Sequence, residues 1–359
     1  MFNFRQMADA IAKIWLVLIA VLFVSCQPVN EENGAAQLSV LEWSGFQKPK
    51  FYPDYTLKYG VAPEFTLFAH TNDALQRMRS GYKVDVVHLC TGQMREARKA
   101  GLIKEIDVSR VARWNEITPE LLDLPDARMD DKYWIAPWNW GYSTIGYNPE
   151  MIDVKDPTYD IFIDPRFKGQ VALPSDTGVN LYIASVIGRW KDPMDPTEEE
   201  MRAAPDIFQK MLRNARFIWT DSTQLEQAWA NGDVGISYIY GSASRRMPKE
   251  GLPIVVVEPL LTWMCGLSVA TTGIASKDQV YDYINAMLDP RSGVELFNEY
   301  GYGHGNSKAI TRMSPDSFAG SGVDDPAGTF ARGIYSGALP PQKKARLMQL
   351  WYETQAALD

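Results

Sequence analysis

The order of apolar and helix-like segments after residue 37 limits the possible folds more than any other feature of this sequence. The segments 38–43, 64–70 and 84–89 are short, apolar and rich in residues with high β-propensity. The segments 72–81 and 92–101 have the composition of helices, and each ends in glycine. A strand followed by a helix and a second strand usually returns to the same sheet as a parallel neighbour. The order therefore predicts an α/β fold whose sheet is flanked by helices.

A second series of the same kind follows in the middle of the chain. A strand over 169–173 leads into a polar turn that contains Asp176. Thr197 and Glu200 form a capping box for the next helix, and Pro205 is expected to bend or restart that helix. Beyond it we expect strands over 216–221, 234–243 and 261–273, and helices over 222–233, 279–288 and 342–358.

The stretch 133–147, YWIAPWNWGYSTIGY, is unusually rich in aromatic residues. Trp138, Trp140 and Tyr142 alternate with smaller residues such as Gly141, and this period of two indicates a strand. The rings are either core residues on both faces of a buried strand, or part of a strand that passes between two lobes beside a ligand cleft. In the second case we expect Trp138 and Trp140 near the cleft floor.

The first residues read as a targeting segment and not as part of the fold. A basic start and an apolar run from Ile14 to Val24 are typical of a signal peptide, and this run is too short for a spanning helix, which needs about 20 apolar residues. The sequence before Cys26 resembles the lipobox of bacterial lipoproteins, although Cys26 can also follow an ordinary cleavage site by chance. We expect a signal peptide over 1–25, a lipidated tether over 26–37, and an exported, periplasmic protein that a lipid on Cys26 anchors to the membrane.

Charge, length and cysteine number exclude some classes of protein. The formal net charge is −8, which disfavours nucleic-acid binding. The chain is longer than one compact core usually requires, so two lobes are expected. After Cys26 only Cys90 and Cys265 remain, too few for a disulfide-built scaffold, and the sequence leaves open whether these two form a bond.

Catalytic and metal-binding motifs are missing from the sequence. It has no nucleophile elbow, no HExxH, no P-loop and no paired CxxC, and its histidines are His70, His88 and His304. His88 and Cys90 lie two apart in a strand, so they project to one face and could hold a soft metal with a third ligand. We favour core or pocket-wall roles for them, and we expect no enzyme activity, no metal and no cofactor.

Aromatic residues accumulate instead where the predicted strands end. Aromatic faces attract ammonium groups, and open α/β sheets bind ligands at the carboxyl ends of their strands. A pocket for an organic cation is therefore expected among these residues, which are Trp43, Phe46, Trp138, Trp140, Tyr238, Tyr240, Trp263 and Tyr302.

Seven motifs in order resemble the bacterial spermidine/putrescine-type solute-binding proteins of ABC importers. They are LEWSGF, VDVVHLCTGQMREARKAGLI with KEID after it, WGYSTIGYN, FKGQVALPSD, ANGDVGISYIYGSA, LTWMCGLSVA and GYGHGNSKA. The resemblance implies a two-lobed periplasmic-binding-protein fold of type II, in which each lobe is a mixed sheet flanked by helices and the lobes close on a ligand. It places lobe 1 at 38–140 plus 264–306, and lobe 2 at 141–263 plus 307–359.

The resemblance also implies a set of ligand-binding residues. Trp43, Ser44, Asp176, Trp263 and Tyr302 match the family, whereas Phe46 replaces a tyrosine. The pattern departs at other positions: Val179 replaces a glutamate, Cys265 an aspartate, Cys90 a serine, Gly92 a tyrosine and Ile239 a tryptophan. The expected ligand-binding set is Trp43, Ser44, Phe46, Cys90, Asp176, Tyr238, Tyr240, Trp263, Cys265 and Tyr302.

These positions lead to one expected function and leave an alternative open. We expect a monomeric solute-binding component that captures a small cationic amine, such as putrescine or spermidine, and delivers it to the permease subunits of an ABC transporter. Because carboxylates are missing, the same scaffold could bind a zwitterion or a quaternary ammonium compound. Arg245 and Arg246 could then receive a ligand carboxylate, or they lie in a solvated loop. An enzyme on this scaffold and a sensor lipoprotein with an empty cleft are the competing classes.

Overall fold

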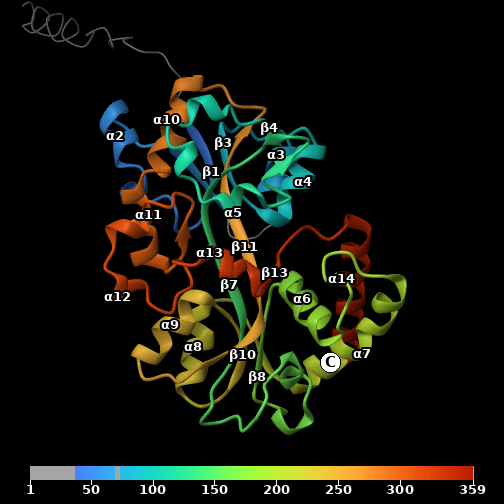
Figure 1. Ribbon diagram of the computed structural model, residues 1–359. Helices are drawn as coiled ribbons and strands as arrows, with labels where there is room; N and C mark the ends of the chain where they lie inside the picture. Colours follow the sequence, from blue (N-terminus) through green and yellow to red (C-terminus); the bar gives the residue numbers. More distant parts are fainter. Residues whose placement is uncertain (1–36, 69–72, 359) are drawn as a thin grey trace, which may run out of the picture. The chain divides into compact units, whose positions relative to one another are not determined.

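The computed structural model describes residues 37–68 and 73–358 (Figure 1). The predictions for the signal peptide, for lipidation of Cys26 and for most of the tether lie outside these residues, as does His70. Within the described ranges, no helix has both the length and the apolar character that a membrane crossing requires.

The strands form one 11-stranded sheet and a separate hairpin. The main path of the large sheet is β2-β1-β3-β11-β7-β10-β8-β9, with β12 paired to β7 and both β4 and β13 paired to β11. The strands are β1 Ser39–Trp43, β2 Glu64–Phe68, β3 Val86–Cys90, β4 Ile103–Lys104, β5 Arg128–Met129, β6 Lys132–Tyr133, β7 Ala136–Tyr147, β8 Val171–Pro174, β9 Ala215–Trp219, β10 Ile236–Tyr240, β11 Val255–Ala270, β12 Gly303–His304 and β13 Gly333–Tyr335.

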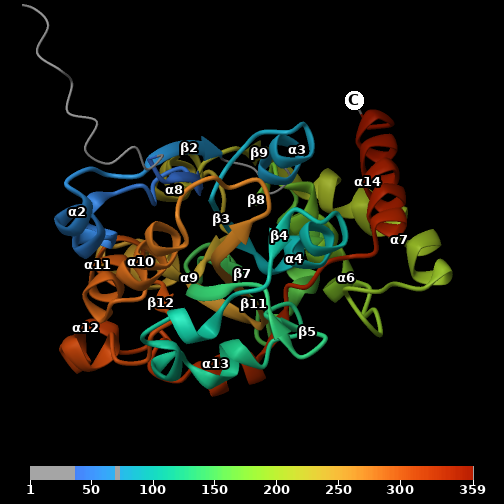
Figure 2. The same cartoon turned by 90° about the horizontal axis from the view of Figure 1, so that it is seen from above.

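Helices cover both groups of parallel strands (Figures 1 and 2). They are α2 Pro53–Tyr59, α3 Asp73–Arg79, α4 Thr91–Lys99, α5 Pro119–Leu122, α6 Thr177–Ile187, α7 Glu198–Asn214, α8 Ser222–Ala230, α9 Gly241–Lys249, α10 Lys277–Met287, α11 Pro290–Tyr300, α12 Pro315–Phe318, α13 Pro326–Ala331 and α14 Pro341–Ala356. Figure 2 shows α14 beside α7, where Trp351 stacks edge-on against Phe208 with ring centres 5.2 Å apart.

The parallel pairing predicted for the first strands is confirmed. β1 pairs in parallel with both β2 and β3, and β8 pairs in parallel with both β9 and β10. The predicted capping box is also present, since the hydroxyl of Thr197 accepts from the amide of Glu200 and begins α7. However, α7 continues through Pro205 without interruption, so the expected restart of the helix at this proline is wrong.

Two long strands run through the middle of the sheet and join its two groups of parallel strands (Figure 1). β7 and β11 pair antiparallel along most of their lengths. The aromatic stretch thus forms a strand, as its period of two predicts, and it begins at Ala136. β11 is longer than expected, because it includes residues 255–260 that the sequence places before the strand. Its pairing with β7 is shifted between Val257 and Leu261, which lets one strand bend past Pro259.

Buried side chains form three clusters on this framework. One cluster contains residues between 145 and 261 together with Leu347 and Trp351 of α14. The other two contain residues from 38–140 and 264–296, one on each face of the sheet around β1 and β3. The lobe boundaries given by the sequence stay a prediction.

Candidate functional site

The register of β7 and β11 brings the carboxyl ends of both groups of parallel strands to one place. Cys90, the last residue of β3, lies opposite Cys265 of β11. Tyr240, the last residue of β10, lies opposite Ser143 of β7. Between these two points Trp263 lies opposite Gly141. The middle of the two long strands is therefore where an α/β sheet of this kind binds a ligand.

Four aromatic residues form a continuous wall on this face of the sheet. The rings of Trp263 and Tyr302 meet edge to face, with centres 4.8 Å apart. Tyr302 stacks against Tyr300 at 5.8 Å, and Tyr300 lies 4.7 Å from Phe46. We call Phe46, Tyr300, Tyr302 and Trp263 the aromatic wall. Three of these rings belong to the predicted set, whereas Tyr300 at the end of α11 does not.

A second group of aromatic residues comes from the end of β10. Tyr238 is buried, Tyr240 is exposed by about a third, and their rings lie 5.7 Å apart. Burial raises the pKa of the Tyr240 phenol, and the negative charge of Asp176 raises it further. Burial also raises the pKa of Tyr302, with Tyr240 as the next cause. The charge of Asp176 thus acts on the Tyr240 phenol, and Tyr240 in turn acts on Tyr302.

Asp176 is the carboxylate that the sequence predicts for this site. It follows β8 directly and is the N-cap of α6, where its Oδ1 accepts the amide hydrogen of Gly178 at 2.8 Å. Its side chain is exposed, and it has no ion-pair partner in residues 37–68 and 73–358. Asp176 therefore has a structural role as a helix cap and a charge that remains available to a cation.

Cys90 and Cys265 form a disulfide, which answers the question that the sequence left open. Their Cα atoms lie 3.9 Å apart although the residues are 175 positions apart in the chain. The bond joins β3 to β11 at the edge of the site, and Cys265 is 6% exposed. Because both sulfurs are oxidised, Cys90 cannot act as a thiolate ligand, so the soft-metal alternative with His88 is wrong. In the described part of the chain no cluster of three metal-ligating side chains occurs.

His88 belongs to a buried polar network behind the aromatic wall. Its Nδ1 is hydrogen-bonded to the carboxylate of Glu42, and its Nε2 to Asn139 Oδ1 at 3.0 Å. The Glu42 carboxylate also accepts the backbone amide hydrogen of Trp43. The edge of the His88 ring meets Phe46 at 5.5 Å, so this network supports the base of the wall.

The side chains of two predicted residues do not extend the aromatic wall, although the Phe46 amide donates to the Trp43 carbonyl at 3.1 Å. The ring of Trp43 lies against Phe68 at 4.5 Å and packs with the cluster on the opposite face of the sheet. Ser44 is exposed, and its backbone amide donates to the carbonyl of Phe68. Because side chains alternate along β1, Trp43 and Glu42 point to opposite faces. Both residues remain predicted ligand contacts.

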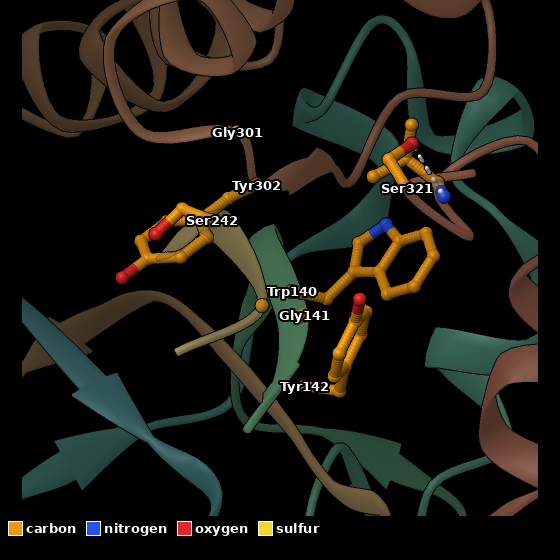
Figure 3. Close-up of a pocket in the computed structure, with 9 residues that line it drawn as sticks. Trp140, Gly141, Tyr142, Ser242, Gly301, Tyr302 and Ser321 are labelled. Atoms are coloured by element: carbon orange, nitrogen blue, oxygen red, sulfur yellow. Dashed lines mark hydrogen bonds between the residues drawn. The ribbon is translucent and has the colours of Figure 1, made fainter. Parts of the chain in front are cut away.

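A small pocket lies next to the wall (Figure 3). In Figure 3, Trp140 and Tyr142 project from β7 to one side of Gly141, and Tyr302 lies on the other side with Ser242 and Gly301. Ser242 and Gly301 were not predicted as site residues, because small residues carry no chemical signature. Their proximity follows from the packing of the start of α9 against the end of α11, where a Cβ on Gly301 would lie 3.3 Å from Ser242 Cβ.

A sheet with two groups of parallel strands, and a candidate site where their carboxyl ends meet, is typical of a solute-binding protein. Residues 58–320 match the model of the bacterial extracellular solute-binding protein family, and the chain belongs to this family. Its expected role in binding and transport, with no enzyme activity, agrees with this membership. The family is extracellular or periplasmic.

Individual relatives are similar over most of the chain. The spermidine/putrescine-binding periplasmic protein of Salmonella typhimurium is 24% identical over 300 residues, which cover 81% of this chain and 84% of the relative. The putrescine-binding periplasmic protein PotF of Escherichia coli is 22% identical and covers 90% of this chain and 92% of its own. The crystal structure of the spermidine/putrescine ABC transporter substrate-binding protein PotD from Streptococcus pneumoniae has a TM-score of 0.74 at 17% identity, covering 89% of this chain and 98% of that one. The predicted type II periplasmic-binding-protein fold is thereby confirmed.

Proposed function

We propose that this protein is the substrate-binding component of an ABC importer and that it captures a small polyamine, such as putrescine or spermidine, for its permease. The observation that carries the proposal is the carboxylate of Asp176, which lacks an ion-pair partner among the described residues and whose negative charge raises the pKa of Tyr240. The names of the relatives support the same ligand class, because they describe spermidine- and putrescine-binding proteins.

The aromatic wall gives this site a second means of holding a cation. An ammonium group over an aromatic ring gains about 0.5 to 2 kcal/mol, with the larger values in desolvated sites. Trp263 and Tyr302 present two such rings at right angles, 4.8 Å apart. One ammonium of the ligand pairs with Asp176, and its carbon chain lies along the rings. Closure of the protein around the ligand removes water and strengthens both interactions.

The disulfide limits the charge that the site offers. Cys90 and Cys265 stand where the family resemblance implies a serine and an aspartate, and a disulfide carries no charge. Binding of a second ammonium group of the ligand therefore depends on the faces of aromatic rings and on neutral hydrogen-bond acceptors. The zwitterion or quaternary ammonium alternative is not favoured by the relatives, whose names describe polyamines.

Calorimetric titration tests the proposal. The panel consists of putrescine, spermidine, glycine betaine and 4-aminobutanoate. We expect putrescine or spermidine to bind, and a polyamine at 100 times its Kd to add about 2.7 kcal/mol to the free energy of unfolding. The absence of any polyamine binding would contradict the proposal. Chemical conversion of the amine during incubation would instead favour an enzyme, and binding of betaine alone would favour the alternative.

The proposal extends to the location and assembly of the protein. We infer that the protein is a monomer, exported and anchored by a lipid on Cys26. The anchor is tested by labelling cells with a radioactive fatty acid and comparing the wild type with Cys26→Ser. Label in the wild type alone supports the anchor, and an unlabelled wild type contradicts it. Light scattering with and without putrescine tests the monomer, which a larger mass would contradict.

A further inference from the structure

Two adjacent arginines on α9 have different surroundings. The side chain of Arg246 is exposed and forms ion pairs with both Glu226 and Glu250. Arg245 points instead toward α11, where its guanidinium carbon lies 4.5 Å from the ring centre of Phe297. The same two roles were predicted from sequence for both arginines, but only Arg246 is a solvated surface residue.

The guanidinium of Arg245 lacks polar partners. Its Nε and Nη1 atoms are buried and have no hydrogen-bond partner, and no carboxylate in the described ranges lies within ion-pair distance of it. Burial lowers the pKa of Arg245 accordingly. The face of Phe297 offsets only part of the cost of such burial, because a cation on a ring gains about 0.5 to 2 kcal/mol whereas an unpaired buried charge costs several kcal/mol.

The free edge of this guanidinium is at the rim of the pocket beside the aromatic wall. Arg245 lies one helical turn after Gly241 and Ser242, which line that pocket together with Tyr302. A Cβ built on Gly301, another lining residue, would lie 3.7 Å from Arg245 Nη2. Nη2 is thus the guanidinium nitrogen that faces a lining residue of the pocket. Figure 3 shows Ser242, Gly301 and Tyr302 together at this side of the pocket.

We propose that Arg245 forms an anion subsite at the rim of the solute pocket, which takes a carboxylate of the solute or a small inorganic anion. A planar guanidinium with free N–H groups is suited to a carboxylate or similar anion, and a charge-assisted hydrogen bond is about twice as strong as a neutral one. Asp176 of the proposed amine site and Arg245 at the rim of this pocket each lack an ionic partner in the described part of the chain. The subsite rests on the proposed amine site, since the amine occupies Asp176 while the anion occupies Arg245.

Two charge-matched variants isolate the subsite. Arg245→Gln and Arg246→Gln each remove one positive charge from the same turn of α9, and only the first removes the unpaired guanidinium. Arg245→Lys keeps the positive charge. It replaces Arg245→Gln in the comparison if Arg245→Gln strongly lowers the melting temperature. Each protein is titrated with putrescine and with 4-aminobutanoate, which have the same chain length and differ in one end group. The putrescine titration is repeated with chloride exchanged for the larger anion isethionate at constant ionic strength.

The two sources of the anion give different results. If the solute supplies it, the wild type and Arg246→Gln bind 4-aminobutanoate at least about tenfold more tightly than Arg245→Gln does, because a hydrogen bond to a charged group contributes about 1.5 to 3 kcal/mol. If a free anion fills the subsite, putrescine affinity depends on chloride in the wild type and in Arg246→Gln, and this dependence disappears in Arg245→Gln. In both cases Arg245→Lys lies nearer the wild type than Arg245→Gln.

The proposal is overturned if Arg245→Gln and Arg246→Gln have the same affinities for both compounds in both salts. It is also overturned if Arg245→Lys behaves as Arg245→Gln does while melting at the wild-type temperature, because the charge would then be irrelevant. Failure of the amine site gives a different pattern, in which the wild type binds no putrescine in either salt.

Discussion

The indole of Trp263 lies across Gly141 of the neighbouring strand, so that a Cβ added to Gly141 would come within 2.9 Å of Trp263 Cζ2. The missing side chain at position 141 is what lets this ring lie flat on β7 and meet Tyr302. The aromatic wall thus depends on a glycine in the strand beside it.

Gly141→Ala is expected to displace Trp263 and weaken putrescine binding about tenfold, equivalent to the roughly 1 to 1.5 kcal/mol of one cation–ring contact. Titration calorimetry measures the change. Gly92→Ala is the matched control, because a Cβ there meets only the Gly337 carbonyl at an ordinary 3.7 Å. Equal affinities in the two variants would show that the position of the Trp263 ring does not matter for binding.

Asp176→Asn separates the two roles of this residue. Asparagine caps a helix as well as aspartate does, so the free energy of unfolding should change by less than about 0.5 kcal/mol. Loss of the charge should reduce putrescine affinity about 10- to 100-fold, because a hydrogen bond to a charged group contributes about 1.5 to 3 kcal/mol. Asp176→Ala should lose both properties. Wild-type affinity in Asp176→Asn would exclude this carboxylate from the ligand site.

The disulfide between Cys90 and Cys265 should stabilise the protein by about 2 to 4 kcal/mol, because it closes a long loop of the unfolded chain. Urea unfolding with and without a phosphine reductant measures this contribution. The double variant Cys90→Ser with Cys265→Ser should have the stability of the reduced wild type and should not respond to the reductant. An unchanged urea midpoint after verified reduction of the wild type would contradict the prediction.

His304 should make the protein less stable in mild acid. Its Nε2–H donates to the Met287 carbonyl and its Nδ1 accepts from the Asn306 amide, so the buried ring is neutral. Burial lowers the pKa of His304 to about 4 from an ordinary value near 6.5. Between these values only the unfolded state takes up the proton, and therefore stability falls as the pH decreases from 6.5 to 4.

The loss over that window should be about 3 kcal/mol, since one pKa unit corresponds to about 1.4 kcal/mol. Urea unfolding at pH 7 and pH 4.5 measures it, and His304→Gln is the comparison because it cannot take up this proton. The variant should lose less stability between the two pH values than the wild type does. Equal losses would assign the acid sensitivity to other groups.

The local features of this protein can be predicted from its sequence alone. The strands of the first α/β series, their parallel order, the capping box at Thr197 and the aromatic strand all follow from short-range patterns of apolar, capping and β-branched residues. The aromatic residues at strand ends, which include Trp263 and Tyr302, predict a cation pocket, and the family resemblance adds Asp176 to the predicted site.

Which of these residues are in contact depends on how distant elements pack together. The pairing of Cys90 with Cys265 depends on the register of β3 and β11, which are brought together from distant parts of the chain. Trp43 is turned away from the aromatic wall and Tyr300 is included in it, because strand alternation and the docking of α11 fix their directions. Arg245 and Arg246 are neighbours in sequence, but successive residues of a helix point about 100° apart. Arg245 therefore packs on the buried ring of Phe297, whereas Arg246 forms ion pairs with two carboxylates. Local patterns predict which elements form, whereas contacts between distant elements decide which face of each element a ligand can reach.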